Sequence, residues 1–390
     1  MTTKSLTKNH PLAGKKMMGA DMIVQILADE GVDTIFGYSG GAILPTYDAV
    51  FRFNEENKDS DGNQPMPLIV PANEQGAGFM ASGYARASGK VGVVMVTSGP
   101  GATNTVTPIR DCMADSIPIV VISGQVPTTA IGTDAFQEAP VSAIMGAVSK
   151  HIFLVTDPLL LESTIRSAFE LAKTGRPGPV VVDIPKDIQN WEGEFLGSGS
   201  LPLTGYRNRL ETVMNNNLND ELAKNFYKLL SKSKKPLIYA GGGVINADAS
   251  SQLRQFSETY KIPIVTTLMA LGASDTTKSL SLHMLGMHGL ASANYAVEDC
   301  DFLIAIGARF DDRVAGDPKG FAPNAKKIAH FDIDISEINK VKNVDWYHVG
   351  SLKKDLNDLI ALGEKIEFVS DFSGWHSHIE KLKKEYKLNY

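Results

Sequence analysis

The stretch Val91-Gly-Val-Val-Met-Val-Thr97, followed at once by Ser98-Gly-Pro-Gly-Ala-Thr-Asn104, decides the fold class. Its first half is almost continuously apolar, as a strand buried on both faces of a parallel sheet must be. Its second half is a glycine-rich turn that opens a helix, so backbone N–H groups face whatever lies beyond the strand. A buried strand that turns directly into a helix predicts a doubly wound α/β fold.

The same alternation of apolar runs and helical segments recurs on both sides of this stretch. Apolar residues have helical spacing in 19–30, 74–88 and 159–173. The other short apolar runs, which we expect to be strands, are Leu68–Val70, Pro118–Ser123, Pro179–Ile184, Pro236–Ala240, Pro263–Thr267, Phe302–Gly307 and Lys327–Ile333. The pattern predicts an α/β protein with two doubly wound parallel-sheet domains, at residues 19–188 and 219–363.

Three segments fall outside these domains. Residues 1–18 are polar and basic, and we expect a disordered leader there. Residues 189–218 are rich in Gly, Asn and Ser without a hydrophobic period, which predicts a linker. Residues 364–390 are expected to start a further linker and to end in a polar, helix-prone segment.

Composition and charge exclude several classes of function. The chain has 390 residues, 43% of them hydrophobic and 21% charged, which is typical of a globular protein. The net charge is −6 and no Lys/Arg cluster stands out, so we expect neither a nucleic acid nor an anionic membrane as partner. No apolar run reaches the roughly 18 residues of a membrane span. Cys112 and Cys300 are interpreted as buried thiols in a reducing compartment, which predicts a cytoplasmic location, or an organelle for a eukaryotic precursor.

Four motifs follow predicted strands, at the edge where such sheets bind ligands. Asn73–Gly76 places the carboxylate of Glu74 at a helix start, which suits a functional acid or a simple helix cap. Thr97–Asn104 and Gly241–Asn246 suit a ligand-approaching backbone or an ordinary tight turn. Gly307–Arg313 contains two arginines and two aspartates, which suit an anionic ligand or a solvated salt-bridge cluster.

Two histidines in one loop do not indicate a metal site. His283 and His288 are five residues apart, and no third ligand of suitable spacing is near them. We therefore predict no metal ligands in this chain and expect backbone packing or cofactor contact for the two side chains.

In this order and spacing, the motifs closely resemble the large catalytic subunit of acetolactate synthase (acetohydroxyacid synthase), a family of thiamine diphosphate-dependent transferases. The resemblance runs from about Gly19 to about Lys387. The long matching stretches are Phe36–Ala42, Asn73–Gly101, Gly124–Glu138, Gly175–Asp187 and Leu285–Val314. It implies a first domain that contacts the thiamine pyrimidine, a second that binds FAD, and a third that holds the diphosphate through Mg²⁺.

The resemblance also implies roles for individual residues. Glu74 is similar to the catalytic glutamate that bonds the pyrimidine ring nitrogen and favours its imino tautomer, which then takes the proton of the thiazolium carbon. Gln137 resembles the glutamine near the thiamine, Phe136 and Lys186 the wall of the access channel, and Arg313 the arginine that holds the acceptor carboxylate. The positions similar to FAD contacts are Arg176, Gly242, Thr267, Leu268, Leu285, Gly286, Met287, His288, Gly307, Ala308, Arg309, Asp311, Asp332 and Ile333.

The family's third-domain signature is Gly-Asp-Gly or Gly-Asp-Ser followed by Asn-Asn. The Gly-Asp at Gly316-Asp317 lies in the predicted FAD domain, and Asn215–Asn217 lies in the predicted linker. We therefore expect the Mg²⁺ ligands in a third domain on another chain, and this chain alone to be inactive.

The implied reaction joins pyruvate to pyruvate or 2-oxobutyrate with loss of CO₂, in branched-chain amino acid biosynthesis. The implied partners are further copies in a homo-oligomer and a small regulatory subunit. Two alternatives stay open: another thiamine diphosphate enzyme of the pyruvate oxidase or decarboxylase type, and a truncated, non-catalytic FAD-binding remnant. Arg313 and the stretch 125–134 argue against the first alternative.

Overall fold

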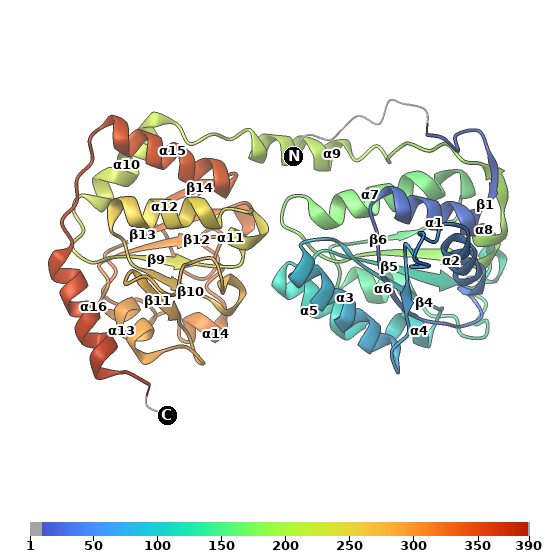
Figure 1. The fold of residues 1–390 in the computed structure, drawn as a ribbon, viewed down its shortest axis with the longest axis horizontal. Helices are drawn as coiled ribbons and strands as arrows, with labels where there is room; N and C mark the ends of the chain where they lie inside the picture. Colours follow the sequence, from blue (N-terminus) through green and yellow to red (C-terminus); the bar gives the residue numbers. More distant parts are fainter. Residues whose placement is uncertain (1–9, 389–390) are drawn as a thin grey trace. The chain divides into compact units, whose positions relative to one another are not determined.

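The computed structural model describes residues 10–388 (Figure 1). The chain divides into two compact units, with unit 1 ending at Leu203 and unit 2 beginning at Thr204. Each unit is built on its own six-stranded parallel sheet, so the predicted fold class is confirmed. No helix within residues 10–388 combines the length and the apolar character that crossing a membrane requires.

The unit 1 sheet has the strand order β3-β2-β4-β5-β7-β6. Its strands are β2 (Ile35–Tyr38), β3 (Leu68–Ile69), β4 (Gly92–Val96), β5 (Ile119–Gln125), β6 (His151–Leu154) and β7 (Val180–Pro185). Val94 in β4 lies opposite Phe36 in β2 and Val121 in β5. Every residue of β4, β5 and β7 is buried, because helices cover both faces of the sheet.

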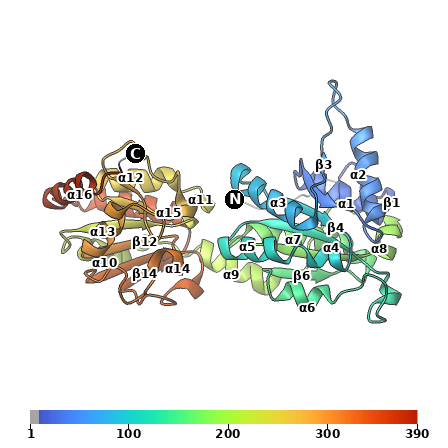
Figure 2. The ribbon, with the colours of Figure 1, turned by 90° about the horizontal axis from the view of Figure 1, so that it is seen from below.

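Helices α1 and α7 cover one face of this sheet, and α3 and α5 cover the other (Figure 1). The helices of unit 1 are α1 (Gly19–Asp29), α2 (Leu44–Glu56), α3 (Glu74–Ser88), α4 (Pro100–Thr103), α5 (Val106–Asp115), α6 (Val141–Gly146), α7 (Leu161–Lys173) and α8 (Lys186–Asn190). In α1 the apolar residues Met22, Ile23, Ile26 and Leu27 share the buried stripe that their spacing predicts. Between α2 and β3 the chain protrudes in a turn at Asp59–Asn63 (Figure 2).

The unit 2 sheet has the order β11-β10-β9-β12-β13-β14. Its strands are β9 (Pro236–Ala240), β10 (Ile264–Thr266), β11 (Ser281–Met284), β12 (Phe302–Ile306), β13 (Lys327–Asp332) and β14 (Trp346–Val349). Numbered within the unit, this order is 3-2-1-4-5-6, the arrangement of doubly wound sheets whose ligand crevice lies where the strand order reverses. Here the reversal lies between β9 and β12.

The helices of unit 2 are α9 (Thr204–Met214), α10 (Asp220–Leu230), α11 (Gly243–Asn246), α12 (Ser250–Tyr260), α13 (Ala291–Asp299), α14 (Asp312–Ala315), α15 (Leu352–Lys365) and α16 (Ser373–Glu385). Helices α10, α12 and α15 pack together on one face, and α13 and α16 lie on the other (Figure 1). The ring of Phe226 in α10 packs against Phe256, Phe302, Phe331 and Trp346, which ties that helix to the sheet.

The predicted linker at 189–218 is not free of regular structure. It contains the antiparallel strand β8 (Glu192–Glu194), the buried Phe195 and helix α9. Strand β8 pairs with β1 (Lys16–Met18), so the predicted disordered leader is wrong for residues 10–18. Residues 1–9 of that leader lie outside the described part of the chain. Backbone hydrogen bonds between β1 and β8 order these parts of the two segments. Such pairing needs no hydrophobic period, so the sequence pattern does not reveal it.

The tail predicted to begin a linker at 364–390 instead carries α16, which packs on unit 2. Trp375 and Ile379 are buried, and Trp375 Nε1 donates to the Pro236 carbonyl at 3.0 Å. The ring of Tyr386 stacks on Tyr295 of α13, with ring centroids 4.6 Å apart. The helix itself is as predicted, but its apolar stripe makes it part of unit 2.

Candidate functional site

The strand order of unit 1 reverses between β2 and β4, and two predicted motifs meet there. Thr97 follows β4, and its Oγ1 accepts a hydrogen bond from Ala42 N at 3.2 Å. A Cβ added to Gly40 would lie 2.5 Å from Thr97 Cγ2, so the turn after β2 requires glycine at this close approach. The carboxyl ends of β2 and β4 therefore meet at the reversal of strand order, the place where such sheets bind ligands.

Glu74 lies at this edge as the first residue of α3, and its side chain is buried. Asn73, not Glu74, caps the helix, since its Oδ1 accepts from Gly76 N at 2.8 Å. Glu74 Oε2 instead accepts from Asn104 Nδ2 at 2.9 Å. The carboxylate is thus held in place at a helix N-terminus, where the helix dipole favours negative charge.

The glycine-rich turn and Tyr47 complete the surroundings of Glu74. A Cβ on Gly101 would lie 3.6 Å from Glu74 Oε1, which places the turn beside the free side of the carboxylate. Tyr47 of α2 donates to the Met95 carbonyl at 3.0 Å. Burial, and next the negative charge of Glu74, raise the pKa of Tyr47, so its phenol stays protonated.

The loop after β5 brings Gln137 to the same edge. The Gln137 backbone has a left-handed φ of 58°, and its carbonyl carbon would lie 2.8 Å from a Cβ on Gly99. Glu138 closes the loop by accepting from Gly132 N at 2.5 Å and Ala135 N at 3.1 Å. The Gly132 bond is the main cause that holds the pKa of Glu138 below its usual range. Gln137 is therefore fixed beside the turn that adjoins Glu74.

Phe136 lies in this loop, next to Gln137, and Lys186 lies in a helix bonded to it. Phe136 is 88% exposed, the largest exposure among the large apolar residues of the described chain. Lys186 is half-buried at the start of α8, and its neighbour Asp187 accepts from Thr128 N at 3.0 Å. The start of the loop is thereby bonded to the helix that carries Lys186.

A buried carboxyl group lies beneath the loop. Asp183 of β7 is 1% exposed and accepts from Ser123 Oγ at 2.6 Å and Gln125 Nε2 at 2.9 Å. Burial raises the pKa of Asp183 to about 6, although the two hydrogen bonds act in the opposite direction. This group joins β7 to the last residue of β5, where the loop begins.

In unit 2 the glycines after β9 contact the turn after β12. Gly241 N donates to the Ile306 carbonyl at 2.9 Å, and Gly243 N to the Gly307 carbonyl at 3.0 Å. A Cβ on Gly243 would lie 2.7 Å from Gly307 Cα, and one on Gly242 would lie 2.9 Å from Met269 Cβ. The glycines therefore let backbone approach backbone at the point where this strand order reverses.

The other predicted FAD contacts in unit 2 lie at the same carboxyl edge. Thr267 follows β10, and its buried Oγ1 has no hydrogen-bond partner in the described chain, while the adjacent Leu268 is 66% exposed. The remaining predicted contacts lie at or just after the ends of β11, β12 and β13 and are Leu285, Gly286, Met287, His288, Gly307, Ala308, Arg309, Asp311, Asp332 and Ile333. Arg176 is the exception: it belongs to unit 1, where its Nε donates to Ser116 Oγ at 2.9 Å, at the amino edge of that sheet.

Arg313 also lies at the carboxyl edge of unit 2, at the second residue of α14. Its backbone carbonyl accepts from Met287 N at 3.0 Å, and its N–H donates to Asp311 Oδ1 at 3.2 Å. Its side chain is exposed and makes no ion pair with any described residue, whereas Arg309 and Asp311 approach to 3.8 Å. The Arg313 guanidinium is therefore not part of a salt-bridge cluster among the described residues.

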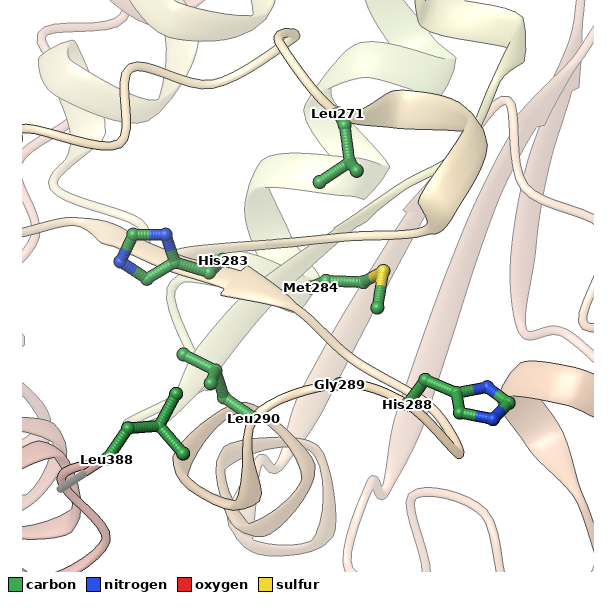
Figure 3. A pocket seen from close by; sticks show the side chains of 7 residues that line it. All are labelled: Leu271, His283, Met284, His288, Gly289, Leu290 and Leu388. Atoms are coloured by element: carbon green, nitrogen blue, oxygen red, sulfur yellow. The ribbon is translucent and has the colours of Figure 1, made fainter. Parts of the chain in front are cut away.

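A shallow apolar pocket of about 420 Å³ adjoins this edge (Figure 3). It is lined by Leu271, His283, Met284, His288, Gly289, Leu290 and Leu388. The two histidines lie at opposite ends of the pocket. Within residues 10–388, no three His, Cys, Asp or Glu side chains gather as metal ligands would.

The sequence alone did not predict a role for two asparagines that hold neighbouring groups in place. Asn104 holds Glu74, and its only signal was its place in the glycine-rich motif. Asn294 of α13 holds Gly286 on both sides, accepting from its N–H at 2.8 Å and donating to its carbonyl at 3.0 Å. Only the folded chain brings each amide to its partner.

Comparison with known proteins gives two matching domain families. Residues 17–144 match the N-terminal TPP binding domain of thiamine pyrophosphate enzymes, and residues 223–359 match their central domain.

Several acetolactate synthases match most of this chain. The acetolactate synthase large subunit of Corynebacterium glutamicum is 44% identical over 98% of this chain and 59% of its own length. The mitochondrial acetolactate synthase catalytic subunit of Saccharomyces cerevisiae is 43% identical over 96% and 54%, respectively. The probable acetolactate synthase large subunit of Methanocaldococcus jannaschii is 45% identical over 94% and 60%. The chain thus spans 54–60% of the length of these relatives, and it belongs to the thiamine pyrophosphate enzymes, of which it carries the N-terminal TPP-binding and central domains.

Proposed function

We propose that this chain forms the N-terminal and central part of an acetolactate synthase large subunit, a thiamine diphosphate-dependent transferase. The proposed reaction is the decarboxylating condensation of pyruvate with pyruvate or 2-oxobutyrate, in branched-chain amino acid biosynthesis. The observation that carries the proposal is the 43–45% identity with acetolactate synthases over at least 94% of this chain.

Glu74 supports this proposal by its position. Its carboxylate lies at the reversal of strand order, with Oε2 held by Asn104 and Oε1 beside the Gly99–Gly101 turn. A pyrimidine ring nitrogen placed at Oε1 would share a proton with the carboxylate. When bound, thiamine diphosphate supplies the carbanion chemistry, and Glu74 sets the tautomer of its pyrimidine. Gln137, fixed next to the same turn, would contact the cofactor and the substrate carbon.

Three other side chains would bind and admit the substrates. The exposed guanidinium of Arg313 suits the carboxylate of the acceptor 2-oxo acid, because its fork can donate two parallel hydrogen bonds. Phe136 and Lys186 would line the access channel, since Phe136 lies in the loop that carries Gln137 and Lys186 begins the helix bonded to that loop.

FAD fits the carboxyl edge of unit 2. The residues proposed to hold it are the predicted contacts that follow β9 to β13, together with Arg176 of unit 1. Gly242 and Gly307 lie in the two turns at the reversal of strand order, where such sheets bind ligands, and the buried Oγ1 of Thr267 leaves a hydrogen-bonding group available to a ligand. Mg²⁺ has no matching ligand group within residues 10–388, so no step through it is assigned to these residues.

We further propose that a third domain, in the same polypeptide or on another chain, holds Mg²⁺ and the diphosphate. The proposed assembly is a homo-oligomer that can bind a small regulatory subunit. The proposed location is the cytoplasm, or an organelle in a eukaryote.

The test is acetolactate formation from pyruvate with thiamine diphosphate, Mg²⁺ and FAD. The chain is assayed alone and together with the C-terminal part of the Corynebacterium glutamicum relative that this chain does not span. We expect activity in the mixture and none in a mixture made with Glu74→Gln. Product formation with 2-oxobutyrate as acceptor separates this function from an oxidase or decarboxylase. An inactive mixture in which the chain still binds FAD would favour the non-catalytic alternative.

A further inference from the structure

We propose that His330 is a positioning residue that holds the turn after β12 in the shape that FAD binding needs. The inference rests on the proposed FAD site in unit 2. His330 lies in β13 and is fully buried, and its Nε2 is 2.8 Å from the Ala308 carbonyl oxygen. Because a carbonyl can only accept, Nε2 must carry the proton and donate it.

The turn at Gly307–Phe310 needs such support. Gly307 and Phe310 both have left-handed φ angles, of 58° and 57°, and this region is unfavourable for a phenylalanine. The Phe310 ring packs edge-on against the His330 ring, with centroids 5.3 Å apart. His330 therefore contacts the turn at two points, through a hydrogen bond and through a ring.

Three hydrogen bonds fix the turn between its neighbouring strands. Gly307 N donates to the Phe331 carbonyl at 2.8 Å, and the Gly307 carbonyl accepts from Gly243 N at 3.0 Å. The bond from His330 to Ala308 is the third, and it lies farthest from the strand. Without it, the peptide between Ala308 and Arg309 can rotate, which moves the backbone of Arg309, a proposed FAD contact.

Stability alone does not account for a histidine here. His330 Nδ1 is buried and has no hydrogen-bond partner among the described residues. An orphaned buried acceptor costs more than one neutral hydrogen bond returns, so an apolar ring of similar size would fill the site with less penalty. Asp332 Oδ2 lies 3.7 Å from Nε2, too far for a hydrogen bond. The bond to Ala308 is thus the specific contribution of the imidazole.

The experiment measures FAD binding to the full chain by quenching of flavin fluorescence. His330→Phe keeps a ring but removes the donor, and we expect the Kd for FAD to rise at least about tenfold, as it does when the binding-competent turn falls to about a tenth of the population. His330→Gln, which can place a donor at the same distance from the backbone, should stay within about threefold of the wild type. Ile328→Ala on the same strand is the matched control, because it removes packing and leaves the Ala308 bond intact.

A second readout does not depend on flavin. Amide hydrogen exchange at Gly307–Phe310 in the FAD-free chain should accelerate in His330→Phe and not in Ile328→Ala. Equal FAD affinity in the wild type and His330→Phe would overturn the positioning role but not the proposed flavin site. A loss of FAD affinity in Ile328→Ala as large as that in His330→Phe would do the same. Failure of the wild-type chain to bind FAD would overturn the proposed flavin site, and the positioning role with it.

Discussion

The two units have the same kind of sheet but different carboxyl edges. In unit 1 the reversal between β2 and β4 presents a carboxylate, Glu74, held from one side by Asn104. In unit 2 the reversal between β9 and β12 presents backbone, because Gly241–Gly243 and Gly307 leave no room for side chains. The fold fixes where each site lies, and the residues in the turns decide which chemistry it can perform.

Individual buried polar groups near the two edges differ in the same sense. In unit 1 the buried carboxyl groups of Glu74 and Asp183 have hydrogen-bond partners, which are Asn104 for the first and Ser123 and Gln125 for the second. In unit 2, Thr267 Oγ1 and His330 Nδ1 are buried without partners among the described residues. We infer that unit 1 is arranged for proton chemistry and unit 2 for holding an extended ligand. The following variants test whether the two functions separate.

The largest expected effect is that of Glu74→Gln. In the mixture with a supplied third domain, acetolactate formation should fall about 10²–10⁴-fold, the usual contribution of a group that manages a proton. FAD binding should be unchanged, because the proposed flavin site lies mainly in unit 2. Activity is followed by acetolactate production and binding by flavin fluorescence. Retained activity would contradict the catalytic role of Glu74. A loss of FAD binding in the same variant would show that the two proposed sites do not act independently.

Asp183 should make unit 1 less stable as pH rises. Its pKa is about 6 in the folded chain against 3.8 as the ordinary value. Between these values the folded state binds more protons than the unfolded state, so the free energy of unfolding falls with rising pH, by about 3 kcal/mol in total.

Urea unfolding of the wild type and Asp183→Asn between pH 4 and 7.5 measures this effect. Subtracting one series from the other cancels the remaining titrating groups. The difference should change through pH 4–6 and level off above it. Two parallel curves would mean that folding leaves the pKa of Asp183 at its ordinary value.

Gly243→Ala should be the unit 2 counterpart of Glu74→Gln. The new Cβ would lie 2.7 Å from Gly307 Cα, so the turns that follow β9 and β12 must shift apart. We expect a loss of about 1–3 kcal/mol in unfolding free energy and a marked weakening of FAD binding. Gly374→Ala in α16, where the Cβ meets open space, is the control and should cost nothing. Unimpaired FAD binding in Gly243→Ala would exclude the glycines from the flavin site.

The smallest effect compares two glycines of α3, the helix that begins at Glu74. A Cβ on Gly83 meets no atom, and Gly83→Ala should stabilise the chain by up to about 1 kcal/mol, because alanine is the better helix former. A Cβ on Gly78 would lie 2.7 Å from Pro108 Cβ, so Gly78→Ala should destabilise it. Thermal unfolding of both variants measures the contrast. A stabilised Gly78→Ala would mean that α3 is less tightly seated on α5 than its contacts indicate.

The strands that could be predicted are those with continuous apolar runs. Central strands such as β4, β5 and β12 are buried along their whole length, so each appears in the sequence as a continuous apolar run. The strands that were not predicted include three at sheet edges, β6, β11 and β14, of mixed composition such as Ser281–Met284. An edge strand has one neighbour and partial exposure, so its order depends on backbone pairing rather than on an apolar pattern.

The sequence by itself determined the α/β class, the two sheets, and the turns that carry Glu74, the glycines and Arg313, because buried strands and glycine-rich turns are local patterns. Only the tertiary structure decided what those turns meet: Asn104 at Glu74, Asn294 at Gly286 and His330 at Ala308. It also placed Arg176 in unit 1, at the amino edge of that sheet, and packed α16 on unit 2. Such contacts join residues that are distant in sequence. No local sequence pattern predicts them, because they form only when the folded sheet brings its turns and helices next to one another.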